Sequence, residues 1–466
     1  MLKCRMAPHP VSTPDESREI SFKEAFWVWA RIGVLSFGGP AGQIALMHRE
    51  LVEERRWISD GRFLHALNYC MLLPGPEAQQ LATYIGWLLH RTWGGLVAGG
   101  LFVLPGFLMI LALSIIYGAY GNVLWVSATF FGLKAAVLAV VVEAVVRISK
   151  RALRNAAMVS LAAAAFVAIY FFEVPFPAIV LGAGLLGLAA ERLAPRLIPE
   201  SLVRRGETSA GYVVDRMIAE GKLAHIGTRA TRTIAVTLAW LGIWAAPTVL
   251  CLVLLGPDHV FTQVGLFFSK ASVVTFGGAY SVLAYIAQQA VEVYAWVTPG
   301  EMLDGLALAE TTPGPLIMVV QFVGYLAAFR FESALSPTTS AVIGSVITTW
   351  VTFAPCFLWI FAGAPYIERL IGNRWLNAAL SCITAAVVGV ILNLSVWFAV
   401  HVLFERVDEV RFGPVRTLIP ELGSVSVVSV LIAAGSALAL LRFHQGIGRT
   451  LLAAAAAGLA WRLALV

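Results

Sequence analysis

Charged residues are scarce in this sequence. Asp, Glu, Lys and Arg together make up 13% of its 466 residues, whereas soluble domains contain about 25%. Hydrophobic residues make up 59%, and the mean hydropathy is +0.81. A chain with so few charges cannot cover itself with a water-soluble surface. We therefore expect an all-α polytopic membrane protein that is embedded in a lipid bilayer through many spans.

The sequence lacks the residue patterns that several kinds of functional site require. The five cysteines form no CxxC pair, which argues against a disulfide framework and a zinc site, and we expect no metal or cofactor. No Lys/Arg cluster with interleaved aromatics indicates nucleic-acid binding, so the net charge of +6 fits basic cytoplasmic loops. The sequence also lacks a Walker A motif for ATP and an HExxH motif. The first 21 residues are mostly polar, which predicts no cleaved signal peptide.

A gap-free duplication is present instead. Adding 239 to the residue numbers places Phe37-Gly38-Gly39 on Phe276-Gly277-Gly278, and Pro74-Gly75-Pro76 on Pro313-Gly314-Pro315. Across positions 34–76, 14 of the 43 residues are identical. Chance similarity would not keep one register across two helix-breaking clusters, so we interpret the match as an internal repeat.

The duplicated clusters interrupt apolar segments at residues 22–47 and 63–90, and again at 262–290 and 302–328. Each interruption leaves half-helices of about 11–15 residues, shorter than the roughly 20 that span a bilayer. Non-helical backbone at that depth survives when it is buried in protein or lines a cavity. We therefore predict broken, re-entrant helical hairpins.

The remaining apolar segments predict conventional spans and a division of the chain into three parts. The spans lie near residues 95–118, 122–146, 155–172, 176–190, 233–256, 340–364, 376–403, 424–441 and 446–466. Residues 1–190 then form an N-terminal repeat, and residues 191–232 form a polar cytoplasmic linker. Residues 233–466 form a C-terminal repeat with one extra leading span.

Loop charges predict that the two repeats have opposite orientations in the membrane. The loop at 147–154 has four basic residues and no acid, and the loop at 48–62 has four arginines, so both should be cytoplasmic. The loop at 287–301, which matches 48–62, has no Lys or Arg and should be external. Inverted repeats around a shared midplane are a transporter architecture.

Helices that begin inside the membrane point free N–H groups and the positive end of a dipole into the protein. Glycine lets the backbone approach a ligand, and Pro40 and Pro76 begin new apolar runs at no hydrogen-bond cost. This pattern predicts an anion site. The alternative is that the Gly/Pro clusters only permit kinks and close packing.

Ionisable residues within the apolar segments extend this site. Arg31 and Lys270 are equivalent in the repeat and either add positive potential or extend to a membrane interface. Glu77 and Glu310 flank the two Pro-Gly-Pro turns; burial favours a protonated carboxyl group, so either could carry a coupled proton, and Glu77 could instead cap its own helix. The candidate substrate-binding residues are Arg31, Ser36, Gly38, Gly39, Gln43, Gly75, Glu77, Lys270, Thr275, Gly277, Gly278, Glu310, Thr311, Thr312 and Gly314.

These motifs together resemble the chromate ion transporter family. The resemblance rests on Phe37-Gly38-Gly39-Pro40 with Gln43, on Arg56-Trp57 and on residues 73–76, and it includes residues 309–315 of the second half. It covers about residues 22–200 and 258–466 and implies a long two-domain member. It also implies chromate efflux from the bacterial cytoplasm across the inner membrane, which confers resistance. One departure is Ala279, where the first half has Pro40, so the two halves are expected to contribute unequally.

Other functions stay open from the sequence. A carrier of sulfate or of several oxyanions would have the same architecture, because sulfate and chromate are both tetrahedral dianions. An intramembrane enzyme would use Glu77, Glu143 or Glu310, but no nucleophile–base pairing accompanies these acids. A membrane scaffold is a third alternative, and the sequence leaves a homodimer open.

Overall fold

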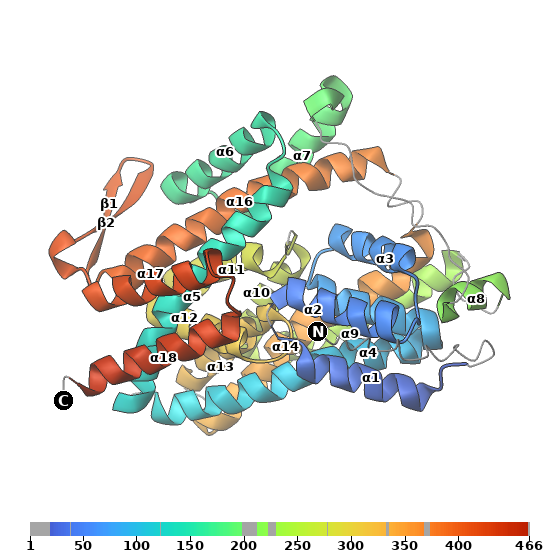
Figure 1. Cartoon of the computed structure of the whole chain (residues 1–466), viewed down its shortest axis with the longest axis horizontal. Coiled ribbons are helices and arrows are strands. Elements are labelled where there is room, and N and C mark those ends of the chain that lie inside the picture. Colours follow the sequence, from blue (N-terminus) through green and yellow to red (C-terminus); the bar gives the residue numbers. More distant parts are fainter. Residues whose placement is uncertain are drawn as a thin grey trace, which may run out of the picture.

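The computed structural model describes residues 19–37, 39–121, 123–197, 212–221, 230–276, 278–331, 335–367 and 373–464. Within these ranges the chain is almost entirely helical (Figure 1). Helices long and apolar enough to cross a membrane are α4 (Glu77–Tyr120), α5 (Leu124–Ala152), α7 (Phe176–Leu193), α9 (Ala230–Leu255), α14 (Pro337–Gly363) and α16 (Arg374–Leu403). The chain is therefore an all-α polytopic membrane protein.

The predicted interruptions are found in all four broken segments. The first half pairs α1 (Phe22–Leu35) with α2 (Gly39–His48), and α3 (Asp60–Leu72) with α4. The second half pairs α10 (Val260–Val273) with α11 (Ala279–Gln288), and α12 (Pro299–Thr311) with η5 (Leu316–Met318) and α13 (Val319–Arg330).

Helix α4 contains the predicted break between the segments at 63–90 and 95–118. Two helices meet within it, and the backbone is non-helical at His90 and Arg91. Glycines explain how its two arms come into contact there: a Cβ atom on Gly86 would lie 2.4 Å from the carbonyl oxygen of Gly94. The chain reverses at this point, where the first predicted segment ends.

Local backbone geometry recurs at the spacing of the sequence repeat. Short π-helices follow α2 and α11, as η1 (Arg49–Glu54) and η4 (Gln289–Val293). Each is followed by a non-glycine residue with positive φ, Arg56 at 54° and Ala295 at 50°, which are 239 positions apart. The opposite orientation of the two halves in the membrane stays a prediction.

The last helices of each half pack on the other half. Helices α6 (Ala156–Phe172) and α7 lie against α16, and α17 (Val427–Leu441) and α18 (Ile447–Leu463) lie against α5 (Figure 1). Glycines allow this close approach, because a Cβ atom on Gly132 of α5 would lie 1.9 Å from the carbonyl oxygen of Ala454 in α18. At the matching interface, a Cβ atom on Gly389 of α16 would lie 2.0 Å from the carbonyl oxygen of Ala162 in α6.

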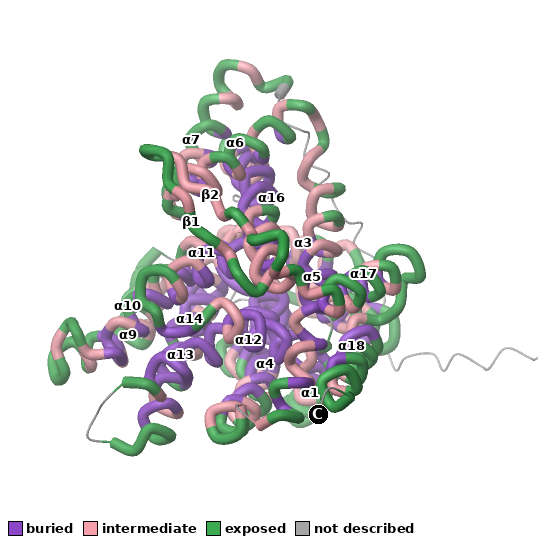
Figure 2. Tube along the Cα trace, turned by 90° about the vertical axis from the view of Figure 1, so that its left-hand side faces the viewer, coloured by how far each residue is buried: buried purple, intermediate pink, exposed green. Residues whose placement is uncertain are grey.

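Buried residues concentrate in the centre, on α4, α12, α13 and α14, while α9 exposes most of its apolar surface (Figure 2).

In the linker, α8 (Val213–Ala219) packs on the loop at 49–62. The Val214 N–H donates to the Trp57 carbonyl oxygen at 2.9 Å, and Arg62 pairs with Asp215. A β-hairpin that was not predicted from the sequence lies between α16 and α17, formed by β1 (Val407–Phe412) and β2 (Val415–Pro420). Short 3₁₀ turns also occur at Pro195–Leu197, Ala364–Tyr366 and Leu422–Ser424.

Candidate functional site

Each of the four loops that interrupt the broken segments contains a glycine with positive φ. We number these loops 1 (residues 36–39), 2 (73–76), 3 (275–278) and 4 (312–315). The φ angles are 69° at Gly39, 119° at Gly75, 97° at Gly278 and 100° at Gly314. Side chains other than glycine rarely adopt such backbone angles, so the loop conformation explains why glycine stands at these positions.

The four loops meet through two reciprocal backbone hydrogen bonds. The Gly75 N–H in loop 2 donates to the Thr275 carbonyl oxygen in loop 3 at 2.8 Å. The Gly314 N–H in loop 4 donates to the Ser36 carbonyl oxygen in loop 1 at 2.9 Å. Donor and acceptor in one bond match those in the other at a spacing of 239, so each half binds the other through the same pair of atoms.

A small cavity lies where the loops meet. Residues from all four helix starts line it, namely Pro40, Gln43, Pro76, Glu77, Ala78, Gly278, Ala279, Pro315, Leu316 and Ile317. Helices α2, α4 and α11 begin at this cavity, so their first-turn N–H groups and the positive ends of their dipoles lie close to it. Such an arrangement can bind an anion.

The predicted hydroxyl groups donate their hydrogen bonds to backbone carbonyl groups of their own helices. Ser36 donates to Ile32 at 2.6 Å, and the equivalent Thr275 donates to Ala271 at 2.7 Å. The hydroxyl group of Thr311 donates to the Ala307 carbonyl oxygen at 3.0 Å, and that of Thr312 donates to the Ala309 carbonyl oxygen at 3.4 Å. These hydroxyls therefore stabilise the helix ends beside the loops, and they do not donate into the cavity in this state.

The two candidate carboxylates have different surroundings. Glu77 lines the cavity at the first turn of α4, and within the described residues its side chain makes no hydrogen bond, so the predicted capping bond is not formed. Glu310 is buried on α12 and accepts a hydrogen bond from the hydroxyl group of Tyr280 on α11. Arg147 of α5 interacts electrostatically with Glu310.

The remaining candidates are not brought together with the loops. Arg31 is exposed and forms an ion pair with Glu50 at 3.4 Å, and Lys270 is exposed on α10. Gly38 and Gly277 lie outside the described residues. Among the described residues, no group of three or more His, Cys, Asp or Glu side chains is arranged to hold a metal ion.

Comparison of the sequence with known proteins identifies the family of this chain. The sequence profile of the chromate transporter family matches residues 23–188 and 262–461. The chain belongs to this family. A chromate transport protein from Pseudomonas aeruginosa is 33% identical over 440 residues, which cover 92% of this chain and 94% of that protein. One from Cupriavidus metallidurans is 29% identical over 389 residues, 83% of each chain.

More distant relatives include an uncharacterized transporter from Methanocaldococcus jannaschii, which is 25% identical over 81% of this chain and 84% of its own length. No solved structure matches the chain. The relatives are named as transport proteins, which points to a transporter rather than an enzyme.

Several polar residues of this transporter were not among the candidates. Tyr280 was missed because its partner Glu310 is 30 residues away in sequence and the first half has Ala41 at the equivalent position. Lys134, a charged residue within the span at 122–146, was also missed. Its partner Asp304 lies in the middle of α12, three residues after Glu301, and nothing in the sequence indicates that it pairs with Lys134.

Gln43 supports two loops of this chromate transporter family member at once. Its side-chain N–H₂ donates to the Gly314 carbonyl oxygen at 2.6 Å and to the Ser36 carbonyl oxygen at 3.4 Å, and the residue is 1% exposed. The second half has Val282 at the equivalent position, so the site is asymmetric.

We expect Gln43→Leu to destabilise the protein by about 1–3 kcal/mol, because it leaves a buried carbonyl group without a donor. Flux should fall together with the thermal midpoint of the purified protein. The matched control is Gln263→Leu, since Gln263 donates to the Asp258 carbonyl oxygen in an exposed turn before α10. Equal midpoints for Gln43→Leu and the wild type would contradict a supporting role.

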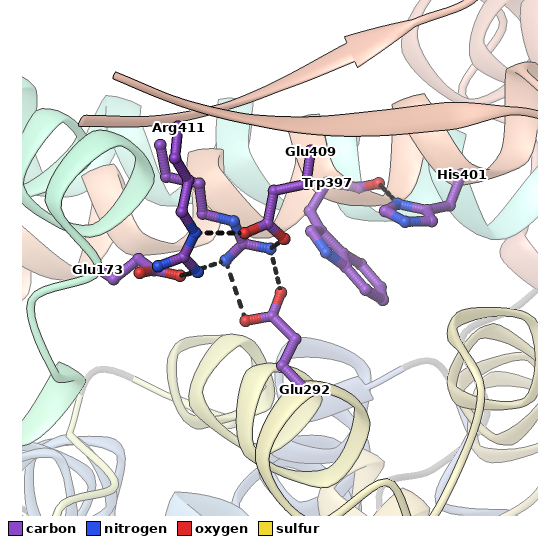
Figure 3. A network of polar contacts seen from close by, with 7 residues as sticks. Glu173, Glu292, Trp397, His401, Glu409 and Arg411 are labelled. Carbon is purple, nitrogen blue, oxygen red and sulfur yellow. Dashed lines mark hydrogen bonds and ion pairs between the residues drawn. The ribbon is translucent and has the colours of Figure 1, made fainter. Parts of the chain in front are cut away.

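The β-hairpin lies at one end of the molecule (Figure 1) and is held there by a network of ion pairs (Figure 3). Arg416 of β2 bonds to Glu173 at 2.8 Å, to Glu292 at 2.9 Å and to Glu409 at 3.0 Å. Arg411 bonds to Glu409 at 2.8 Å and to Glu173 at 3.2 Å. The network joins the hairpin to the α6–α7 connection in the first half and to η4, which continues α11 from the cavity.

This network should weaken in acid. The hydrogen bond from Arg411 holds the pKa of Glu409 below the ordinary value of 4.5, and the charge of Arg416 acts in the same direction. A carboxyl group with a lowered pKa in the folded state stabilises the fold above its unfolded pKa. That stabilisation is lost as pH falls through the folded value.

We therefore expect the hairpin to become mobile as the pH falls below about 4.5. The measurement is the mobility of a spin label at Asp408, an exposed residue of β1, in a background without other cysteines. Adding Glu409→Gln should raise the mobility already at pH 7 and reduce its change with pH. An unchanged pH profile in that variant would argue against a role for Glu409.

Proposed function

We propose that this chain exports chromate from the bacterial cytoplasm across the inner membrane and so confers chromate resistance. The observation that carries this proposal is the pair of reciprocal hydrogen bonds, Gly75 to Thr275 and Gly314 to Ser36, beside one cavity. A tetrahedral dianion accepts hydrogen bonds on every face, and helix starts from both halves surround the cavity with N–H groups. The names of the relatives support chromate as the substrate.

Alternating access around the four loops is the mechanism we propose. The halves are taken as inverted repeats, since the matching loops at 48–62 and 287–301 differ in basic residues and α9 adds an odd span between them. Rocking of one half against the other would then open the cavity first to the cytoplasm and then to the outside. The two reciprocal hydrogen bonds lie at the contact between the halves, so they would rearrange during this motion.

The membrane potential is sufficient to drive export. A potential that is negative inside moves each negative charge outward with about 2.3 kcal/mol per 100 mV, so a dianion gains roughly twice that amount. Proton coupling through Glu77 or Glu310 is thus not required on energetic grounds. Sulfate has the same shape and charge as chromate, and a broader oxyanion carrier is the alternative substrate class.

Flux of labelled chromate into everted membrane vesicles tests this proposal. At a fixed potential, positive inside the vesicle, accumulation should depend on this protein and should persist without ATP. Excess sulfate separates the alternatives, because a selective chromate carrier keeps its flux and a general oxyanion carrier loses it. Absence of protein-dependent flux with either anion would refute the proposed function.

A further inference from the structure

A partly buried ion pair joins the two halves away from the residues that line the cavity. The ammonium group of Lys134 on α5 lies 3.2 Å from Asp304 Oδ2 on α12, and the hydroxyl group of Tyr117 on α4 donates to the same oxygen at 2.8 Å. Asp304 is 3% exposed. Its other carboxylate oxygen, Oδ1, is buried and has no hydrogen-bond partner among the described residues. The carboxylate is therefore only half compensated.

The Lys134–Asp304 pair has no counterpart at the equivalent positions of the other half, although the helices that carry it do. Lys134 stands ten residues after the start of α5, and Thr384 occupies that place in α16. The position 239 residues before Asp304 is His65. Because the second copy of this packing does without a Lys–Asp pair, packing alone does not account for it.

Two helices lead from this ion pair to the cavity loops. Helix α12 carries Asp304 near its middle and leads to Thr312 of loop 4 eight residues later, which is about 12 Å along the helix axis. Helix α4 carries Tyr117 at the ion pair and Gly106 at loop 4, where a Cβ atom would lie 2.6 Å from the Pro313 carbonyl oxygen. The two helices therefore connect the ion pair to loop 4.

The ammonium group is more accessible than its partner. The Lys134 side chain is 29% exposed, whereas that of Asp304 is 4% exposed. Gly300 leaves one side of the ammonium group uncovered, since a Cβ atom there would lie 3.2 Å from Lys134 Nζ. The other charges nearby are Glu301 and Arg330, which pair with each other.

We infer that Lys134 is a second binding subsite for the transported oxyanion, and that Asp304 holds its ammonium group neutralised while the subsite is empty. This inference rests on the proposed function. A dianion that reaches Lys134 replaces a half-compensated carboxylate as the partner of the ammonium group. Between two transport events, Asp304 pairs with the ammonium group of Lys134. The ammonium group is then not left unpaired in a low-dielectric environment.

The test is the chromate dependence of flux in proteoliposomes that contain the full chain at a fixed potential. Lys134→Gln should raise the KM for chromate about tenfold, the effect of losing one charge-assisted contact. Lys134→Arg should keep the KM within about threefold of the wild type, because the charge is retained. Asp304→Asn should lower the KM, since the ammonium group then has no competing carboxylate, and should slow the maximal rate.

Changes in KM of opposite sign for Lys134→Gln and Asp304→Asn would distinguish a binding subsite from a structural ion pair. If both variants raise the KM equally, or if Lys134→Arg behaves like Lys134→Gln, the subsite is refuted while chromate transport stands. Absent wild-type flux refutes the proposed function and the subsite together. If one single variant fails to fold, the neutral double variant Lys134→Gln with Asp304→Asn decides: a raised KM supports the subsite, and a wild-type KM overturns it.

Discussion

Replacing Gly75 or Gly314 by leucine is expected to abolish chromate flux in a protein that still inserts in the membrane. Both residues have φ angles near 100–120°, which cost a residue with a side chain about 1–2 kcal/mol. A Cβ atom on Gly75 would lie 2.9 Å from Cys356 Sγ, and one on Gly314 would lie 3.0 Å from the Gly106 Cα atom. Overpacking adds about 1–3 kcal/mol, so flux should fall roughly 30-fold or more.

The loss should come from the loops and not from a general effect of leucine. Gly435 on α17 provides the matched control, because it is exposed, has an ordinary helical backbone, and a Cβ atom there would meet nothing within 4 Å. Gly435→Leu should therefore transport like the wild type. Flux that persists in both Gly75→Leu and Gly314→Leu would remove the loops from the transport mechanism.

Replacing Gly132 by leucine should prevent the protein from accumulating in a folded state. A Cβ atom on Gly132 would lie 1.9 Å from the Ala454 carbonyl oxygen and 3.1 Å from the Gly458 Cα atom, both on α18. These are backbone atoms, so the clash cannot be relieved by a side-chain rotation, and α18 must move away from α5. We expect destabilisation of about 3 kcal/mol or more.

The thermal midpoint and the yield of the detergent-purified protein measure this effect. Gly132→Leu should lower both more than the loop variants do, because its Cβ atom would lie 1.9 Å from a backbone atom, whereas the closest contacts at Gly75 and Gly314 are 2.9 and 3.0 Å. The contrast distinguishes residues that hold the fold from residues that form the site. A normal midpoint for Gly132→Leu would mean that α18 is not seated on α5 as described.

The sequence predicted the broken helices well because glycine and proline report backbone conformation directly. Gly39, Gly75, Gly278 and Gly314 all adopt positive φ, as their clustering with proline suggested. The span boundaries agree within a few residues, since hydropathy reports burial in lipid. The reversal at His90 and Arg91 lies where the predicted segment at 63–90 ends, before the segment at 95–118.

The contacts between segments were less accessible to sequence reasoning. The bonds from Gly75 to Thr275 and from Gly314 to Ser36 join backbone atoms, which carry no side-chain signal. The serine and threonine hydroxyls were expected to face a ligand, but in the described structure they bond within their own helices. The β-hairpin was missed because residues 404–423 were treated as a connection, although Val407 to Phe412 mix apolar and charged residues before a turn at Gly413.

Equilibrium binding of labelled chromate to the purified protein tests most directly whether the four loops form one anion site. We predict that the tightest saturable site of the wild type is present in Gly435→Leu and is lost in both Gly75→Leu and Gly314→Leu, while weaker binding at Lys134 is retained. Loss in both variants is expected because each loop is bonded to a loop of the other half. Unchanged binding in the two loop variants, at wild-type yield and thermal midpoint, would contradict a shared site at the four loops.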